Sequence, residues 1–232
     1  MGAIGRCLIL ACLALAGGLL PPAVAVGAPA DPELIEAVRA ADADRVARLL
    51  AAGADPDAAS TRPRYRGKTA LMWAAERGDT RLVELLLAGG AAVDATNANG
   101  GTALMYAAAR GREEPVRVLL RRGANVNARA RHGWTPLLVA TAKRRLGVLD
   151  ILVANGADLE SPDVYGWTPL MRAVEAGNRE VVRFLLEHGA DPAASDGNGV
   201  SVLDVARELD REQIAALLRR YQAGAGTGRA GH

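Results

Sequence analysis

The side chains that most often perform chemistry are scarce in this sequence. It has three histidines (His132, His188 and His232) and two cysteines (Cys7 and Cys12). No two histidines have the i, i+4 spacing of a helical zinc site, and neither H-E-x-x-H nor G-x-S-x-G occurs. We therefore expect no catalytic residue, no metal site, no cofactor and no small-molecule substrate. An enzyme whose site follows none of these patterns is the alternative.

One nucleotide-binding pattern matches by its letters alone. Residues 226–231 spell G-x-G-x-x-G. A dinucleotide site needs a strand before these glycines and a helix after them. Here a helix-like segment precedes the glycines, so we expect residues 223–232 to form a disordered, glycine-rich tail.

Aspartates gather in short segments, as at Asp42 with Asp44, at Asp55 with Asp57, and at Asp191. Their spacing is not that of a calcium-binding EF-hand loop. Capping of turns is the expected role, because an aspartate side chain accepts hydrogen bonds from backbone N–H groups nearby.

Arginine supplies nearly all of the positive charge. Only Lys68 and Lys143 are lysines among 28 basic residues, and 26 acidic residues bring the formal net charge to +2. So small a charge gives no overall attraction for nucleic acid or anionic lipid. The local cluster Arg62, Arg64, Arg66 and Lys68 is either solvated surface or a contact for an acidic protein partner.

The composition limits the class of protein. Of 232 residues, 50% are hydrophobic, 23% are charged and only 3% are aromatic. The apolar fraction excludes a disordered chain, and the charged fraction excludes a membrane-embedded bundle. The core must therefore be aliphatic.

Residues 1–30 have the order of a secretory signal peptide. Arg6 precedes an apolar run over 7–20, and prolines and small residues follow. We expect cleavage near residue 30 and a location in the periplasm or outside the cell, with membrane contact only during export. A lipoprotein attached through Cys12 and an uncleaved anchor are the alternatives. Both cysteines lie in this segment, so the mature chain would have no thiol, which suits an oxidising compartment.

A 33-residue period organises the rest of the chain, and it is marked by Thr69, Thr102, Thr135, Thr168 and Ser201. Each of these residues precedes an apolar run and is a predicted N-cap, whose hydroxyl accepts a free helical N–H. A second apolar run follows in each unit, which predicts two short helices per unit. No such pair can bury its apolar face alone, so the units must stack.

The segments GKTALMWAA, GGTALMYAA, GWTPLLVAT, GWTPLMRAV and GVSVLDVAR resemble the ankyrin repeat family, in particular exported, bacterial-type members. The resemblance implies an all-α solenoid of stacked helix-turn-helix units with β-turn-like fingers. The predicted organisation is a signal peptide over 1–30, a repeat domain over 31–222 and a tail over 223–232. The six units are 31–63, 64–96, 97–129, 130–162, 163–195 and 196–222.

Three departures from the family pattern lead to expectations of their own. The loop from Asp57 to Arg66 is four residues longer than the period predicts. Arg144 occupies a place where other units have a glycine that ends the first helix, so its backbone should be strained or reshaped. Apolar residues replace the family's histidine and should pack in the core; they are Met72, Met105, Leu138 and Met171.

The resemblance also implies a binding surface on the concave face. Its predicted partner-binding residues are Arg64, Tyr65, Arg77, Arg110, Arg131, Trp134, Lys143, Tyr165 and Trp167. Trp134 and Trp167 are 33 residues apart and are expected side by side, either as partner contacts or as residues that pack on the turn. The predicted function is a monomeric, non-catalytic protein-binding module. A dedicated inhibitor or protective partner of one exported enzyme is the alternative.

Overall fold

The structure is a computed structural model that describes residues 31–227, and it is all-α as predicted. The predicted signal peptide and residues 228–232 lie outside this range. Within it are twelve α-helices, two short 3₁₀ helices and no strand. The α-helices pair as α1 (Asp31–Arg39) with α2 (Ala43–Ala51), α3 (Ala70–Arg77) with α4 (Thr80–Ala88), α5 (Ala103–Arg110) with α6 (Glu113–Arg121), α7 (Pro136–Ala142) with α8 (Leu146–Ala154), α9 (Pro169–Glu175) with α10 (Arg179–Glu187), and α11 (Val202–Glu208) with α12 (Glu212–Thr227).

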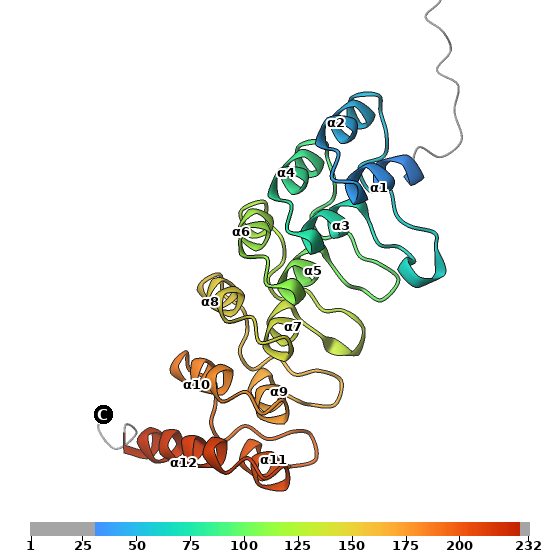
Figure 1. The fold of residues 1–232 in the computed structure, drawn as a ribbon. Helices are drawn as coiled ribbons and strands as arrows, with labels where there is room; N and C mark the ends of the chain where they lie inside the picture. Colours follow the sequence, from blue (N-terminus) through green and yellow to red (C-terminus); the bar gives the residue numbers. More distant parts are fainter. Residues whose placement is uncertain (1–30, 228–232) are drawn as a thin grey trace, which may run out of the picture.

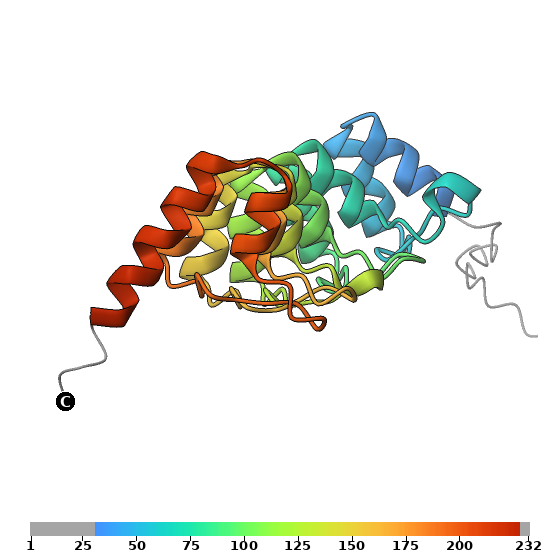
Figure 2. The ribbon, with the colours of Figure 1, turned by 90° about the horizontal axis from the view of Figure 1, so that it is seen from below.

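The pairs stack into a curved two-layer array (Figure 1). The first helices of the pairs form one row, the second helices form the other, and each first helix packs on the first helix of the next pair. The loops between pairs project as fingers from the row of first helices. This row and the fingers lie on the inside of the curve, and Figure 2 shows the fingers gathered along one side of the helices. We call this inner surface the concave face.

The hydroxyl residues that mark the 33-residue period are the N-caps of five first helices, as predicted. Each hydroxyl accepts the backbone N–H three residues later at 3.1–3.4 Å. These bonds satisfy donors that the helix itself leaves free. The period therefore fixes where each first helix begins.

The core is aliphatic and continuous along the stack. Leu71, Leu104, Leu137 and Leu170 repeat on the first helices and are fully buried, as are Leu86, Leu119, Leu152 and Leu185 on the second helices. The residues that replace the family's histidine are buried too, as predicted, at Met72, Met105, Leu138 and Met171. Small alanines beside them let neighbouring first helices approach closely.

The turn inside each pair needs a left-handed residue. Gly78, Gly111 and Gly177 have φ of +86°, +69° and +63°. Arg144 has φ of +56°, so the strained backbone predicted there is present. Two further non-glycine residues have this conformation, and the sequence pattern did not predict them because the terminal units diverge: Ala41 at φ +59° and Asp210 at φ +53°.

Neighbouring fingers are joined by backbone hydrogen bonds. Arg131 N donates to Asn99 O at 2.9 Å, and Val164 N donates to His132 O at 3.0 Å. The longer first finger contains the 3₁₀ helix Pro63–Tyr65, and it is joined to the second finger by the Ala98 N to Arg66 O bond of 3.2 Å. The fingers thus form a connected edge of the concave face.

The last helix is longer than the sequence analysis predicted. α12 continues to Thr227, past the boundary expected at residue 222, and so includes part of the segment expected to be a tail. The alanines and glycines there do not stop the helix. None of the helices described between residues 31 and 227 is both long and apolar enough to span a bilayer.

The left-handed turns give the first prediction. A Cβ added at Gly78 would lie 2.7 Å from Arg112 Cδ, so Gly78→Ala should lower the free energy of unfolding by about 1–2 kcal/mol. Arg144→Gly should change it by less than about 0.5 kcal/mol, since relief of strain offsets the freedom that glycine gains in the unfolded chain. Urea denaturation measures both. Equal losses in the two variants would mean that backbone conformation does not limit this turn.

Candidate functional site

Two positions of each unit place variable side chains on the concave face. One directly precedes the N-cap residue, and it is occupied by Lys68, Gly101, Trp134 and Trp167 in successive units. The other is the fourth residue of the first helix, occupied by Trp73, Tyr106, Val139 and Arg172, all of them half-buried. The caps and leucines repeat from unit to unit, whereas these positions differ in chemistry.

Lys68 lies inside an aromatic cluster at the N-terminal end of this face. Its residue is only 3% exposed, which corrects the prediction that it belongs to a solvated basic loop. The ammonium nitrogen is 3.7 Å from the ring centroid of Trp73 and 4.3 Å from that of Tyr106, and it pairs with Glu76. The rings and the carboxylate replace the water that the ammonium loses.

Glu76 is shared between two cations. Its Oε2 pairs with Lys68, and its Oε1 accepts Arg110 Nε at 3.0 Å and Nη2 at 2.6 Å. Burial lowers the pKa of Lys68 and outweighs the contribution of Glu76. For Glu76, burial is the largest effect and raises the pKa, but the hydrogen bonds from Lys68 and Arg110 and their charges together bring the pKa below its ordinary value.

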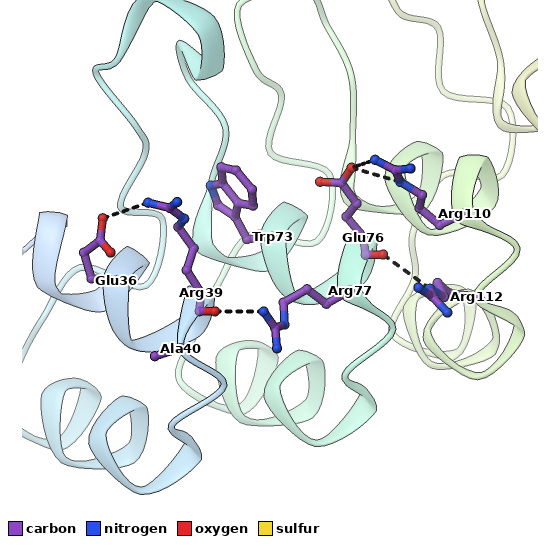
Figure 3. Close-up of a pocket in the computed structure, with 8 residues that line it drawn as sticks. All are labelled: Glu36, Arg39, Ala40, Trp73, Glu76, Arg77, Arg110 and Arg112. Carbon is purple, nitrogen blue, oxygen red and sulfur yellow. Dashed lines mark hydrogen bonds and ion pairs between the residues drawn. The ribbon is translucent and has the colours of Figure 1, made fainter.

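A hollow of about 570 Å³ opens beside this cluster (Figure 3). Arg77 Nη1 donates to Arg39 O at 2.8 Å, and Arg112 Nε donates to Glu76 O at 3.4 Å. The hollow has four arginines and two glutamates, and its formal charge is therefore +2. We call it the arginine hollow; it is lined by Glu36, Arg39, Ala40, Trp73, Glu76, Arg77, Arg110 and Arg112.

The middle of the concave face has a less charged hollow of about 440 Å³. Trp134 and Tyr106 line it from neighbouring units, and Asn97 holds Tyr106 by an Nδ2 to Oη bond of 2.8 Å. Arg131 is the one arginine or lysine in its lining, and there is no acidic residue there. We call it the central hollow; its lining is Asn97, Asn99, Gly101, Met105, Tyr106, Ala109, Ala130, Arg131, His132, Trp134 and Val139.

A third hollow, of about 870 Å³, lies at the C-terminal end. Asp163 is buried, and its carboxylate accepts the backbone N–H groups of Tyr165 and Trp167 at 2.9 and 3.1 Å. Arg172 bonds to Asp163, and its Nη1 bonds to Glu175 at 2.8 Å. With three acidic residues and one arginine, the hollow has a formal charge of −2, and we call it the acidic hollow. It is lined by Asp163, Val164, Tyr165, Gly166, Trp167, Arg172, Glu175, Asp196, Gly197 and Asn198.

Arg172 is held by aromatic rings as well as by acids. Its guanidinium carbon is 4.6 Å from the ring centroid of Trp167 and 5.9 Å from that of Tyr165. Burial lowers the pKa of Arg172, but its hydrogen bonds to Glu175 and Asp163, together with their charges, raise it above the ordinary value. The guanidinium is therefore charged at any physiological pH.

Six of the nine predicted binding residues line the three hollows. Arg77 and Arg110 line the arginine hollow, Arg131 and Trp134 line the central one, and Tyr165 and Trp167 line the acidic one. Trp134 and Trp167 were expected side by side; the structure gives each tryptophan a hollow of its own, and no ring stacking between them is found in the described residues.

The remaining three predicted residues lie outside the hollows. The Tyr65 ring meets that of Trp73 edge-on, with centroids 4.8 Å apart, and Arg64 lies over Tyr65 at 5.6 Å. Lys143 is exposed at the C-terminal end of α7. Tyr65 therefore helps to enclose Lys68, whereas Arg64 and Lys143 are surface cations.

Four residues of this face were not predicted from the sequence, namely Trp73, Tyr106, Arg172 and Asp163. The signal that could have found the first three is their common place, the fourth residue of a first helix. Their contacts could not be found in this way, because Lys68 and Tyr106 are 38 positions apart in different units. In residues 31–227 no three histidine, cysteine, aspartate or glutamate side chains are grouped as metal ligands.

Comparison with known proteins gives one family. A model described as ankyrin repeats (3 copies) matches residues 34–130, 125–196 and 148–224. These matches together extend over the whole stack of helix pairs. A search of curated proteins found no match.

Glu76 and Glu175 occupy the same place in two units and provide the second prediction. Glu76→Gln should lower the free energy of unfolding by about 3 kcal/mol, because it leaves the buried Lys68 without a counter-charge. Glu175→Gln should cost less than about 1 kcal/mol, because Glu175 is exposed. Adding Lys68→Met to Glu76→Gln should restore most of the loss. If the double variant is no more stable than Glu76→Gln alone, the buried charge is not the cause.

Proposed function

Since the chain belongs to the ankyrin repeat family, we propose that it is a non-catalytic module that binds a protein partner on its concave face, in the periplasm or outside the cell. Ankyrin repeats indicate a protein–protein interaction module. The observation that favours the concave face is the series of three hollows along it, which are lined by tryptophan, tyrosine and arginine. These residue types are the most frequent energetic anchors of protein interfaces.

The anchors in these hollows are held in place before a partner arrives. Tyr106 is fixed by Asn97, Arg110 by Glu76, and Arg172 by Asp163. Side chains that are already ordered lose less entropy on binding. The leucines that hold the stack together are separate from them, so the face can bind without a change of fold.

Export is supported by the order of residues 1–30 and by the positions of Cys7 and Cys12 within them. After cleavage, the chain would have no thiol to form an unwanted disulfide in an oxidising compartment. The proposed location therefore follows from the same segment that would direct export.

N-terminal sequencing of the exported protein tests the location. We expect the mature chain to begin between Val26 and Asp31, because small residues occupy the predicted cleavage region. Addition of a reductant should leave its thermal midpoint unchanged. A chain that begins at a lipid-bearing Cys12, or that keeps Met1, would contradict the proposed processing.

Trp134 tests the binding face. Trp134→Ala should weaken binding of the protein partner by about 2 kcal/mol, or about 30-fold, because it removes the largest apolar side chain of the central hollow. The partner is first isolated from an extract of exported proteins by binding to the immobilised parent protein. The purified partner is then titrated against the parent and each variant by calorimetry.

Arg117→Ala is the matched control, because Arg117 is exposed on the second helix of its unit, away from the concave face. It should bind as the parent does. Circular dichroism of the three proteins checks that each is folded. Unchanged affinity for a folded Trp134→Ala protein would exclude the central hollow as the partner contact.

A further inference from the structure

The three hollows differ in charge in a fixed order along the concave face. From the N-terminal to the C-terminal end, their formal charges are +2, +1 and −2, although the whole chain has a net charge of only +2. We propose that this face binds an extended partner segment in one orientation. An acidic stretch lies at the arginine hollow, an apolar side chain enters the central hollow, and a basic stretch lies at the acidic hollow. This inference rests on the proposed function and specifies the chemistry of the partner.

The excess positive charge of the arginine hollow is free to meet a ligand. One carboxylate, Glu76, serves both Lys68 and Arg110. Arg77 and Arg112 donate to backbone carbonyl oxygens, which satisfy one N–H each but do not neutralise the guanidinium. Both arginines therefore keep their charge and further donors for carboxylates of a partner.

The opposite arrangement holds at the acidic hollow. One guanidinium, that of Arg172, serves both Asp163 and Glu175. Asp196 adds a third carboxylate, whose Oδ1 accepts the backbone N–H groups of Asn198 and Val200 at 2.9 Å each. These backbone donors, the Val200 N–H foremost, keep the pKa of Asp196 below its ordinary value, so the group is ionised at neutral pH. The excess charge here is negative, and it favours lysine or arginine.

The central hollow suits an apolar side chain. Met105, Tyr106, Trp134 and Val139 provide apolar walls, and no acidic residue lines it. Burial of an apolar side chain against these walls would supply the affinity, while the charged ends would set the orientation.

The charge order favours a polypeptide over nucleic acid or another uniform polyanion. A polyanion attracted to the arginine hollow would meet Asp163, Glu175 and Asp196 farther along the same face. Like charges placed opposite one another oppose binding. A segment whose charge changes sign along its length avoids this conflict.

The spacing of the charged stretches can be estimated from the stack. The arginine hollow is built around α3, and the acidic hollow is built around α9, three units farther on. Packed helices are about 8–10 Å apart, so the two hollows are separated by about 25–30 Å. An extended chain rises about 3.3 Å per residue. The two charged stretches of the partner would therefore be separated by roughly eight or nine residues.

Two fluorescent peptides of identical composition test the proposal by fluorescence anisotropy with the full processed chain. The block peptide has three glutamates, a spacer of about eight Gly and Ser residues with one central Leu, and three lysines, to match the estimated spacing. The other peptide alternates the six charges. We expect the block peptide to bind about ten-fold tighter than the alternating peptide. This difference in affinity should decrease at high salt, because salt screens surface charges. Equal affinities would overturn the charge order.

Two double variants with the same change in net charge locate the binding. Arg77→Glu with Arg112→Glu should abolish the preference for the block peptide, because these are the arginines of the hollow that bond only to backbone carbonyl oxygens. Arg81→Glu with Arg117→Glu, on the second helices α4 and α6, should retain it. If repulsion from Glu76 lowers the thermal midpoint of the first variant, Arg77→Gln with Arg112→Gln makes the same comparison without new carboxylates. Retention of the preference in the concave-face variants would overturn the proposal.

A photo-crosslinker at either end of the block peptide determines its orientation. A label at the acidic end should attach to residues that line the arginine hollow, and one at the basic end should attach to residues that line the acidic hollow. The reversed pattern would overturn the charge order but leave the concave face as the binding surface. Attachment to the second helices alone would contradict both this inference and the proposed function.

Discussion

Each helix pair of this chain has more apolar surface than it can bury by itself, and the stack exists because neighbouring pairs cover that surface for one another. Leu104 and Leu119 are completely buried only because units lie on both sides of them. Buried alanines such as Ala107 and Ala108 have small side chains, which let the backbones of neighbouring first helices approach one another closely. Stability is therefore shared along the array, and the fold depends on the contact between units more than on any single unit.

Apolar contact alone would let neighbouring units slide, and polar bonds between units fix their register. Asp57 accepts Ala92 N at 2.9 Å, and the equivalent bond recurs at the next three junctions. The later pairs are Asp94 with Asn125, Asn127 with Asp158, and Glu160 with Asp191, at 2.9–3.1 Å. Asp57, which was expected to cap a turn, is thus also an acceptor for the next unit, and these four bonds satisfy backbone donors at their junctions.

The fold was predictable because its determinants repeat. Thr69 and its four equivalents act on the helix that follows each of them, so a periodic pattern was sufficient to place five N-caps. The candidate site was only partly predictable, since its geometry depends on which side chains meet across a junction. Lys68 and Trp134 occupy the same place in different units, yet one is buried with Glu76 and the other lines an open hollow. Ala41 and Asp210 escaped notice as left-handed residues because the first and last units diverge from the pattern.

The division between repeated and variable positions explains how one array can present different chemistry along a single face. The caps and the buried leucines repeat in the units, whereas the residue before the cap and the fourth residue of the first helix differ, so each unit can place a different side chain there. An ionic group at these positions loses water and needs a counter-charge on the same face. Glu76 forms ion pairs with two cations at one end of the face, and Arg172 forms ion pairs with two carboxylates at the other end. The Glu76 cluster keeps one uncompensated positive charge, and the Arg172 cluster keeps one uncompensated negative charge. The contacts that stabilise these charged groups therefore also leave the concave face positive at its N-terminal end and negative at its C-terminal end.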